Sequence, residues 1–139
     1  MAAENISLIR KPPPIALLED VRIENNTSGQ YGGGVHVFGL ASLRINGAEI
    51  TGNQAILGGA IGVWNQSLVS ATFVLFADNT ATFGGAVWVE LGSFVATKST
   101  FSDNQCEDSG IIALSGVSQV IFDTSILWNN SQPVVATIA

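Results

Sequence analysis

Apolar and polar residues alternate in short runs along most of the chain, and the alternation restarts after each of four glycine-containing motifs. Because successive side chains of a β-strand point to opposite faces, a period of two predicts half-buried strands. Glycine and asparagine turns separate the runs, and no segment keeps a helical period. The pattern predicts an all-β chain with three short strands per repeat. The first strand of successive repeats is expected to begin at Val35, Ile61, Val87 and Ile112.

Two motifs recur at a nearly constant spacing and define the repeat. One is an apolar residue followed three positions later by asparagine, and its asparagines are spaced 27, 26, 25 and 26 residues apart. The other motif carries glycines and lies between them. Two motifs that hold the same phase over four repeats indicate a solenoid. The asparagines are Asn26, Asn53, Asn79, Asn104 and Asn130, and the second motif spans Gly32–Val35, Gly58–Ile61, Gly84–Val87 and Ser109–Ile112.

A repeat of this length fits one turn of a parallel β-helix and is too short for a propeller blade, which needs about 40 residues. We predict one domain over residues 1–139, a right-handed, single-stranded parallel β-helix with about five rungs of 25–27 residues. Residues 1–20 are expected to form an irregular first rung and residues 21–135 the repeats. Stacking then predicts two buried apolar columns, Val35-Ile61-Val87-Ile112 and Ile50-Phe76-Phe101-Leu127.

The repeated asparagines are predicted to form a structural ladder. A sharp turn between two sheets leaves backbone N–H and C=O groups facing inward, and the asparagine amide can satisfy both kinds of group. Asparagine also tolerates the left-handed backbone that such turns need. The glycine pairs are expected where φ is positive or where two backbones approach closely.

These motifs resemble the Gly-Gly-Ala-Ile and Phe-x-x-Asn repeats of the chlamydial polymorphic membrane proteins. The matches are Gly58–Ile61, Phe76–Asn79 and Phe101–Asn104, with Gly84–Val87 as a close variant. The similarity covers roughly residues 21–135. It implies a β-helix passenger region in an extracellular or cell-surface location, with an adhesive role. The chain departs from the family where Ser109 replaces a glycine and where Ile50 and Leu127 replace phenylalanine.

Composition narrows the range of functions. Five Lys and Arg residues against eleven Asp and Glu residues give a net charge of −6, which disfavours nucleic-acid binding. No apolar stretch is long enough to predict a membrane span. The single cysteine, Cys106, excludes an internal disulfide. The first residues lack the basic and apolar regions of a signal peptide, so a secreted form is expected to be mature or excised.

Catalytic and metal-binding patterns are weak in this sequence. Asp78 and Asp103 occupy equivalent turn positions in adjacent rungs and form the one candidate calcium site, to which Glu107 and Asp108 could add oxygens. His36, the only histidine, has no nucleophile in a recognisable motif. We predict a non-enzymatic protein without a cofactor. The alternative is a carbohydrate-binding or carbohydrate-processing β-helix fragment similar to pectate lyases.

The outward side of the first strand carries the candidate binding face. If Val35 and Val37 point inward, the alternate residues point outward. A cluster of large aromatic side chains on one face predicts contact with a protein partner, stacking on a glycan, or cover by an N-terminal segment such as residues 15–18. The face consists of His36, Phe38, Trp64, Trp88 and Glu90.

The ends of a β-helix have unpaired strand edges, so they predict association. The chain is expected either to be a piece of a larger β-helix or to stack end to end with other copies into a filament. The sequence thus predicts a structural or adhesive surface module whose partner is protein or glycan.

Overall fold

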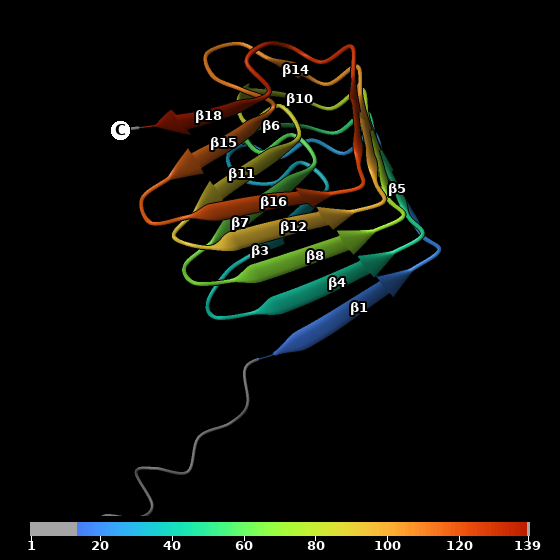
Figure 1. Ribbon diagram of the computed structural model, residues 1–139. Coiled ribbons are helices and arrows are strands. Elements are labelled where there is room, and N and C mark those ends of the chain that lie inside the picture. The colour runs from blue at the N-terminus through green and yellow to red at the C-terminus, as the bar shows by residue number, and fades with distance from the viewer. Residues whose placement is uncertain (1–13, 139) are drawn as a thin grey trace, which may run out of the picture.

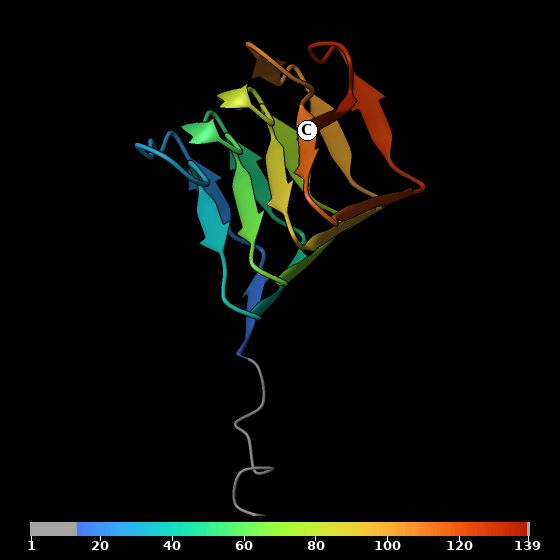
Figure 2. The ribbon, with the colours of Figure 1, turned by 90° about the vertical axis from the view of Figure 1, so that its left-hand side faces the viewer.

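The structure, a computed structural model, describes residues 14–138. Within this range the chain forms 18 strands and no helix. The strands are parallel and coil into a β-solenoid of about five turns, which follow one another from blue to red along the axis (Figures 1 and 2). The all-β parallel β-helix predicted from the repeats is therefore confirmed.

Four sheets, here named A to D, form the sides of the solenoid. Three of them hold five strands, one from each turn, and sheet C holds three. Sheet A contains β1 (Ile15–Glu19), β4 (Ser42–Asn46), β8 (Leu68–Thr72), β12 (Ser93–Thr97) and β16 (Gln119–Asp123). Sheet B contains β2 (Arg22–Glu24), β5 (Glu49–Thr51), β9 (Leu75–Ala77), β13 (Thr100–Ser102) and β17 (Ile126–Trp128). Sheet C contains β6 (Gln54–Leu57), β10 (Thr80–Phe83) and β14 (Gln105–Cys106). Sheet D contains β3 (Val35–Val37), β7 (Ile61–Trp64), β11 (Val87–Glu90), β15 (Ile112–Ser115) and β18 (Val135–Ile138).

Sheets A, B and D are the three strands per repeat that the alternation predicts, and sheet C adds a short fourth strand to the middle turns. The sequence assigned residues 1–20 to an irregular rung. Residues 1–13 lie outside the described residues, whereas β1 is a regular strand that pairs in parallel with β4 over five residues.

Residues with a left-handed backbone turn the chain at the corners between sheets. At the corner between sheets B and C, this conformation belongs to the residue before each ladder asparagine, not to the asparagine itself. The ladder side chain can therefore point inward while its neighbour takes the positive φ. The five corner residues are Asn25, Gly52, Asp78, Asp103 and Asn129.

The core consists of the predicted columns in register. Val35, Ile61, Val87 and Ile112 pair in sequence across sheet D. In sheet B, Phe76 and Phe101 are fully buried and stack with ring centroids 4.5 Å apart. The columns lose their cover at the ends, because Val35 is half-buried and Leu127 is 38% exposed.

The glycine pairs have two separate steric roles. Gly32, Gly58 and Gly84 have positive φ at the corner between sheets C and D. At the next residue the backbones of adjacent turns approach closely, since a Cβ atom on Gly59 would lie 2.1 Å from the Gly85 carbonyl oxygen. Gly110 keeps this second role in the repeat where Ser109 replaces the first glycine.

Candidate functional site

Four aromatic rings form a continuous stack on the outer side of the first two turns. Tyr31 lies between His36 and Trp64, with ring centroids 5.0 Å and 5.8 Å away and planes inclined by 13° and 10°. His36 in turn stacks on Phe38 at 5.1 Å. Phe38 is 58% exposed, His36 is exposed, and Tyr31 and Trp64 are half-buried. We name Tyr31, His36, Phe38 and Trp64 the aromatic stack.

Sheet D places three members of the stack, and a bridge beside sheet C places the fourth. His36 is the outward residue of β3 and Trp64 is the last residue of β7, while Phe38 directly follows β3. Tyr31 forms a parallel bridge with Leu57, the end of β6. Tyr31 precedes the first glycine motif, as Leu57 and Phe83 precede the next two. This shared position was the sequence signal that could have identified it.

Trp88 does not belong to the exposed face, so the prediction of an exposed side chain at this position is wrong. Its side chain is only 6% exposed, its ring meets Phe83 edge to face at 6.3 Å, and its indole N–H donates to Glu90 Oε2 at 3.2 Å. The corner between sheets C and D passes over this part of sheet D. A Cβ atom on Gly58 or Gly84 would lie 3.0 or 3.1 Å from the Trp88 backbone nitrogen.

Glu90 is half-buried and pairs in register with Trp64 across sheet D. Its carboxylate accepts the hydrogen bond from the Trp88 indole, which orients the Trp88 ring. Around the His36 ring, packed atoms remove part of the solvation and lower the pKa of the imidazole below its ordinary value of 6.5. The neutral ring is consequently favoured, as suits its place between two aromatic rings.

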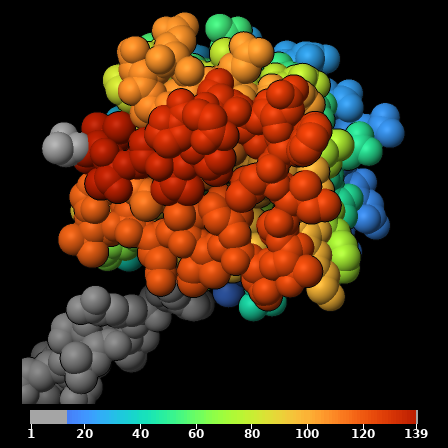
Figure 3. Space-filling model, turned by 45° about the horizontal axis from the view of Figure 1, so that its top comes forward, coloured from blue at the N-terminus to red at the C-terminus, as the bar shows by residue number. Residues whose placement is uncertain are grey.

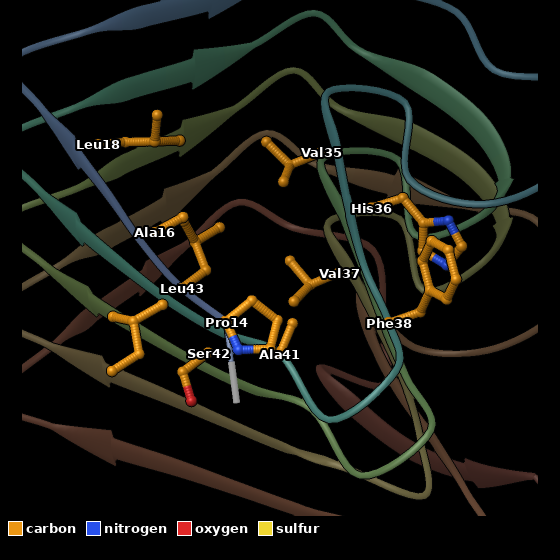
Figure 4. A pocket seen from close by; sticks show the side chains of 11 residues that line it. Pro14, Ala16, Leu18, Val35, His36, Val37, Phe38, Ala41, Ser42 and Leu43 are labelled. Carbon is orange, nitrogen blue, oxygen red and sulfur yellow. The ribbon is translucent and has the colours of Figure 1, made fainter. Parts of the chain in front are cut away.

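Residues 15–18 do not cover the aromatic stack, contrary to one of the three sequence-based interpretations. Residues 15–18 belong to β1 and pair with β4 in sheet A. Beside β1 lies a pocket of about 390 Å³ at the end of the core, lined mainly by apolar side chains of sheets A and D (Figure 4). Figure 4 shows Val35 and Val37 on one side of β3, and His36 and Phe38, which also line the pocket, on the other side.

The acidic pair predicted as a calcium site lies at a turn corner. Asp78 is exposed and Asp103 is half-buried, and both have positive φ. Asp103 Oδ1 accepts a hydrogen bond of 2.6 Å from the Asn129 amide in the next turn. Across residues 14–138 no group of three or more His, Cys, Asp or Glu side chains is arranged to hold a metal ion.

The structure brings all five ladder asparagines together. From Asn26 to Asn104, each Nδ2 and each backbone N–H donates to the Oδ1 atom of the asparagine one turn later, at distances of 2.9 to 3.2 Å. Asn53, Asn79 and Asn104 are fully buried, and each also donates to a carbonyl oxygen of an earlier turn. In the described part of the chain, every buried side-chain nitrogen and oxygen has a hydrogen-bond partner.

No protein-family model matches this chain, and no curated protein or solved structure is significantly similar to it. None of the described residues forms a helix long and apolar enough to cross a membrane.

Proposed function

We propose that this chain is a non-catalytic structural module of an extracellular or cell-surface protein, and that it adheres to a protein partner through the aromatic stack. The observation that supports this proposal is that four aromatic rings, including the 58% exposed Phe38, gather on the outside of the solenoid, away from its buried core. The extracellular setting rests on the resemblance of the repeats to those of the polymorphic membrane proteins.

The ring geometry favours a protein partner over a glycan. Sugars bind to the open faces of aromatic rings, but here the rings are nearly parallel and stack on one another. The stack therefore offers mainly ring edges, bordered by the exposed amides of Asn65 and Gln66. Aromatic anchors with an uncharged polar rim are typical of protein–protein hot spots.

Cell binding tests this proposal. We would label the 139-residue chain and measure its binding to cultured mammalian cells by flow cytometry, before and after protease or glycosidase treatment of the cells. The proposal expects saturable binding that protease removes and that Trp64→Ala and Phe38→Ala each weaken at least ten-fold. Phe73→Ala is the matched control, because Phe73 is also 58% exposed but lies at a different corner.

The outcomes separate the alternatives. Binding that resists protease but is lost after glycosidase treatment would replace the protein partner with a glycan. Equal binding by the Trp64→Ala and Phe73→Ala variants would overturn the role of the aromatic stack. Turnover of pectin or another acidic polysaccharide, lost on Asp78→Ala or Asp103→Ala, would show that the module is an enzyme.

A further inference from the structure

Hydrogen bonds between side chains and backbone give the solenoid a direction. In the asparagine ladder, the donor always belongs to the earlier turn and the Oδ1 acceptor to the later turn, from Asn26 to Asn130. Serine hydroxyls repeat this direction, since they accept from backbone N–H groups one turn earlier. The two ends of the solenoid are therefore chemically different.

The unused groups at the two ends complement each other. Nothing among residues 14–138 donates to Asn26 Oδ1, which lies in the first turn, and Asn26 is exposed. In the last turn, the Asn130 backbone N–H has no acceptor within the described residues, and its Nδ2 donates only to the Phe101 carbonyl. One end thus offers a ladder acceptor and the other end offers ladder donors.

The strand edges at the two ends also match in order, and in length in sheets A and B. Strands β1, β2 and β3 are the first-turn edges of sheets A, B and D, and β16, β17 and β18 are the last-turn edges of the same sheets. The A-sheet edges each have five residues and the B-sheet edges three, while β3 has three and β18 four. Within residues 14–138 the outer edges of these strands have no partner, and unpaired edges pair readily with another chain.

Apolar side chains in the first and last turns are partly exposed, although their counterparts in the middle turns are buried in the core. In the last turn, Leu127 is 38% exposed and Phe122 is half-buried. In the first turn, Leu18 and Ile23 are half-buried, and the pocket of about 390 Å³ opens between sheets A and D. Figure 3 looks toward the last turn, whose orange and red residues form the central part of the visible surface.

We propose that copies of this chain stack head to tail, with the last turn of one copy placed on the first turn of the next. Strands β16, β17 and β18 then pair with β1, β2 and β3, and Asn130 of one copy donates to Asn26 Oδ1 of the other. Phe122 lies on Leu18 and Leu127 on Ile23, which continues the apolar columns. Because the two contact surfaces differ, the assembly is an open filament that adds about 24 Å per copy.

One pair in this register carries like charges. Extending the sheet A register places Asp123 of one copy beside Glu19 of the next, and both side chains are exposed. Like charges directly opposite each other weaken strand pairing, so Asp123→Asn should tighten association about two- to five-fold. This change alters neither the ladder nor the aromatic stack.

Cysteine cross-linking tests the register. In a Cys106→Ser background, Glu19→Cys with Asp123→Cys places two Cα atoms one strand spacing apart, within reach of a disulfide. The matched control pairs Glu19→Cys with Gln119→Cys, at the opposite end of β16. On oxidation at high concentration, we expect a series of dimers, trimers and longer species from the first variant and far fewer from the control.

Sedimentation velocity of the unmodified chain supplies the second measurement. The proposal expects a mean mass that rises with concentration, rises further in Asp123→Asn, and is unchanged in Trp64→Ala, which separates stacking from the partner surface. A monomer at every concentration up to about 1 mM would overturn the proposal. So would equal cross-linking by both cysteine pairs, or dimers from Glu19→Cys alone, because like ends would then be meeting.

Discussion

Removing the amide at the centre of the asparagine ladder should cause a large loss of stability. Asn79 Oδ1 accepts from the Asn53 backbone N–H at 3.0 Å and from Asn53 Nδ2 at 3.2 Å. Its Nδ2 donates to the Ile50 carbonyl at 2.9 Å and to Asn104 Oδ1 at 3.0 Å. The Asn79→Ala variant loses all four bonds in a site with no exposed surface.

The magnitude follows from the groups left behind. A buried donor without an acceptor, here the Asn53 N–H, costs about 1–3 kcal/mol, and each further lost bond contributes up to about 1 kcal/mol. The free energy of unfolding should fall by about 2–5 kcal/mol. For a chain of this size that corresponds to a Tm decrease of roughly 8–18 °C.

Guanidinium and thermal unfolding followed by circular dichroism would measure the effect. Asn46→Ala is the matched control, because Asn46 is an exposed strand residue in the neighbouring sheet. Asn130→Ala should cost less than Asn79→Ala, since Asn130 is only half-buried in the last turn. A free energy of unfolding for Asn79→Ala that lies within about 0.5 kcal/mol of the value for Asn46→Ala would contradict this prediction. That margin is roughly the scatter of surface substitutions.

Three more predictions concern the core, the corners and the histidine. Phe76→Ala should lower the free energy of unfolding by about 3–5 kcal/mol through cavity formation; urea unfolding that differs little from the parent would contradict the buried column. Gly58→Ala, with φ +74° and a Cβ atom 2.2 Å from the Ile61 oxygen, should cost at least about 1–3 kcal/mol by the same measurement, whereas Gly29→Ala, with open space around it, should cost far less. The lowered pKa of His36 means that the native state binds fewer protons than the unfolded state just below pH 6.5, so stability should fall as the pH drops from 6.5 towards the folded pKa. An NMR titration midpoint at or above 6.5 would refute the last prediction, and His36→Phe should remove this component of the pH dependence.

The periodic part of the fold was predictable because it depends on spacing. The constant interval between asparagines placed Asn53 above Asn26 and Asn79 above Asn53, and the hydrogen bonds follow that order. The same interval placed Ile61 and Val87 in register. In a parallel solenoid one period sets every sheet at once, so one repeat length determined both the ladder and the columns.

The corners were less predictable because several residue types can adopt positive φ. The expectation assigned this conformation to the ladder asparagines, but Asp78 and Asp103 adopt it instead. Their position one residue before a ladder asparagine, where the backbone takes a positive φ, gives the recurrence of the two acids a structural explanation. The Asn129 amide, which binds Asp103, occupies the same corner one turn later.

The two tryptophans of sheet D show what the alternation of apolar and polar residues cannot predict. Trp64 and Trp88 share the outward parity of sheet D, yet Trp88 is buried and Trp64 is not. Parity determines the side of the sheet to which a residue points, but not what lies over that side. Trp88 is the second residue of β11, beneath the glycine corner, whereas Trp64 is the fourth residue of β7, beyond that corner. The neighbours of Trp88 in register are Gly62 and Ala113, both buried, whose small size leaves room for the indole under the corner. The proposed binding at the fourth position and the packing at the second are therefore separable. We expect Trp88→Ala to lower stability and Trp64→Ala to weaken only the proposed partner binding.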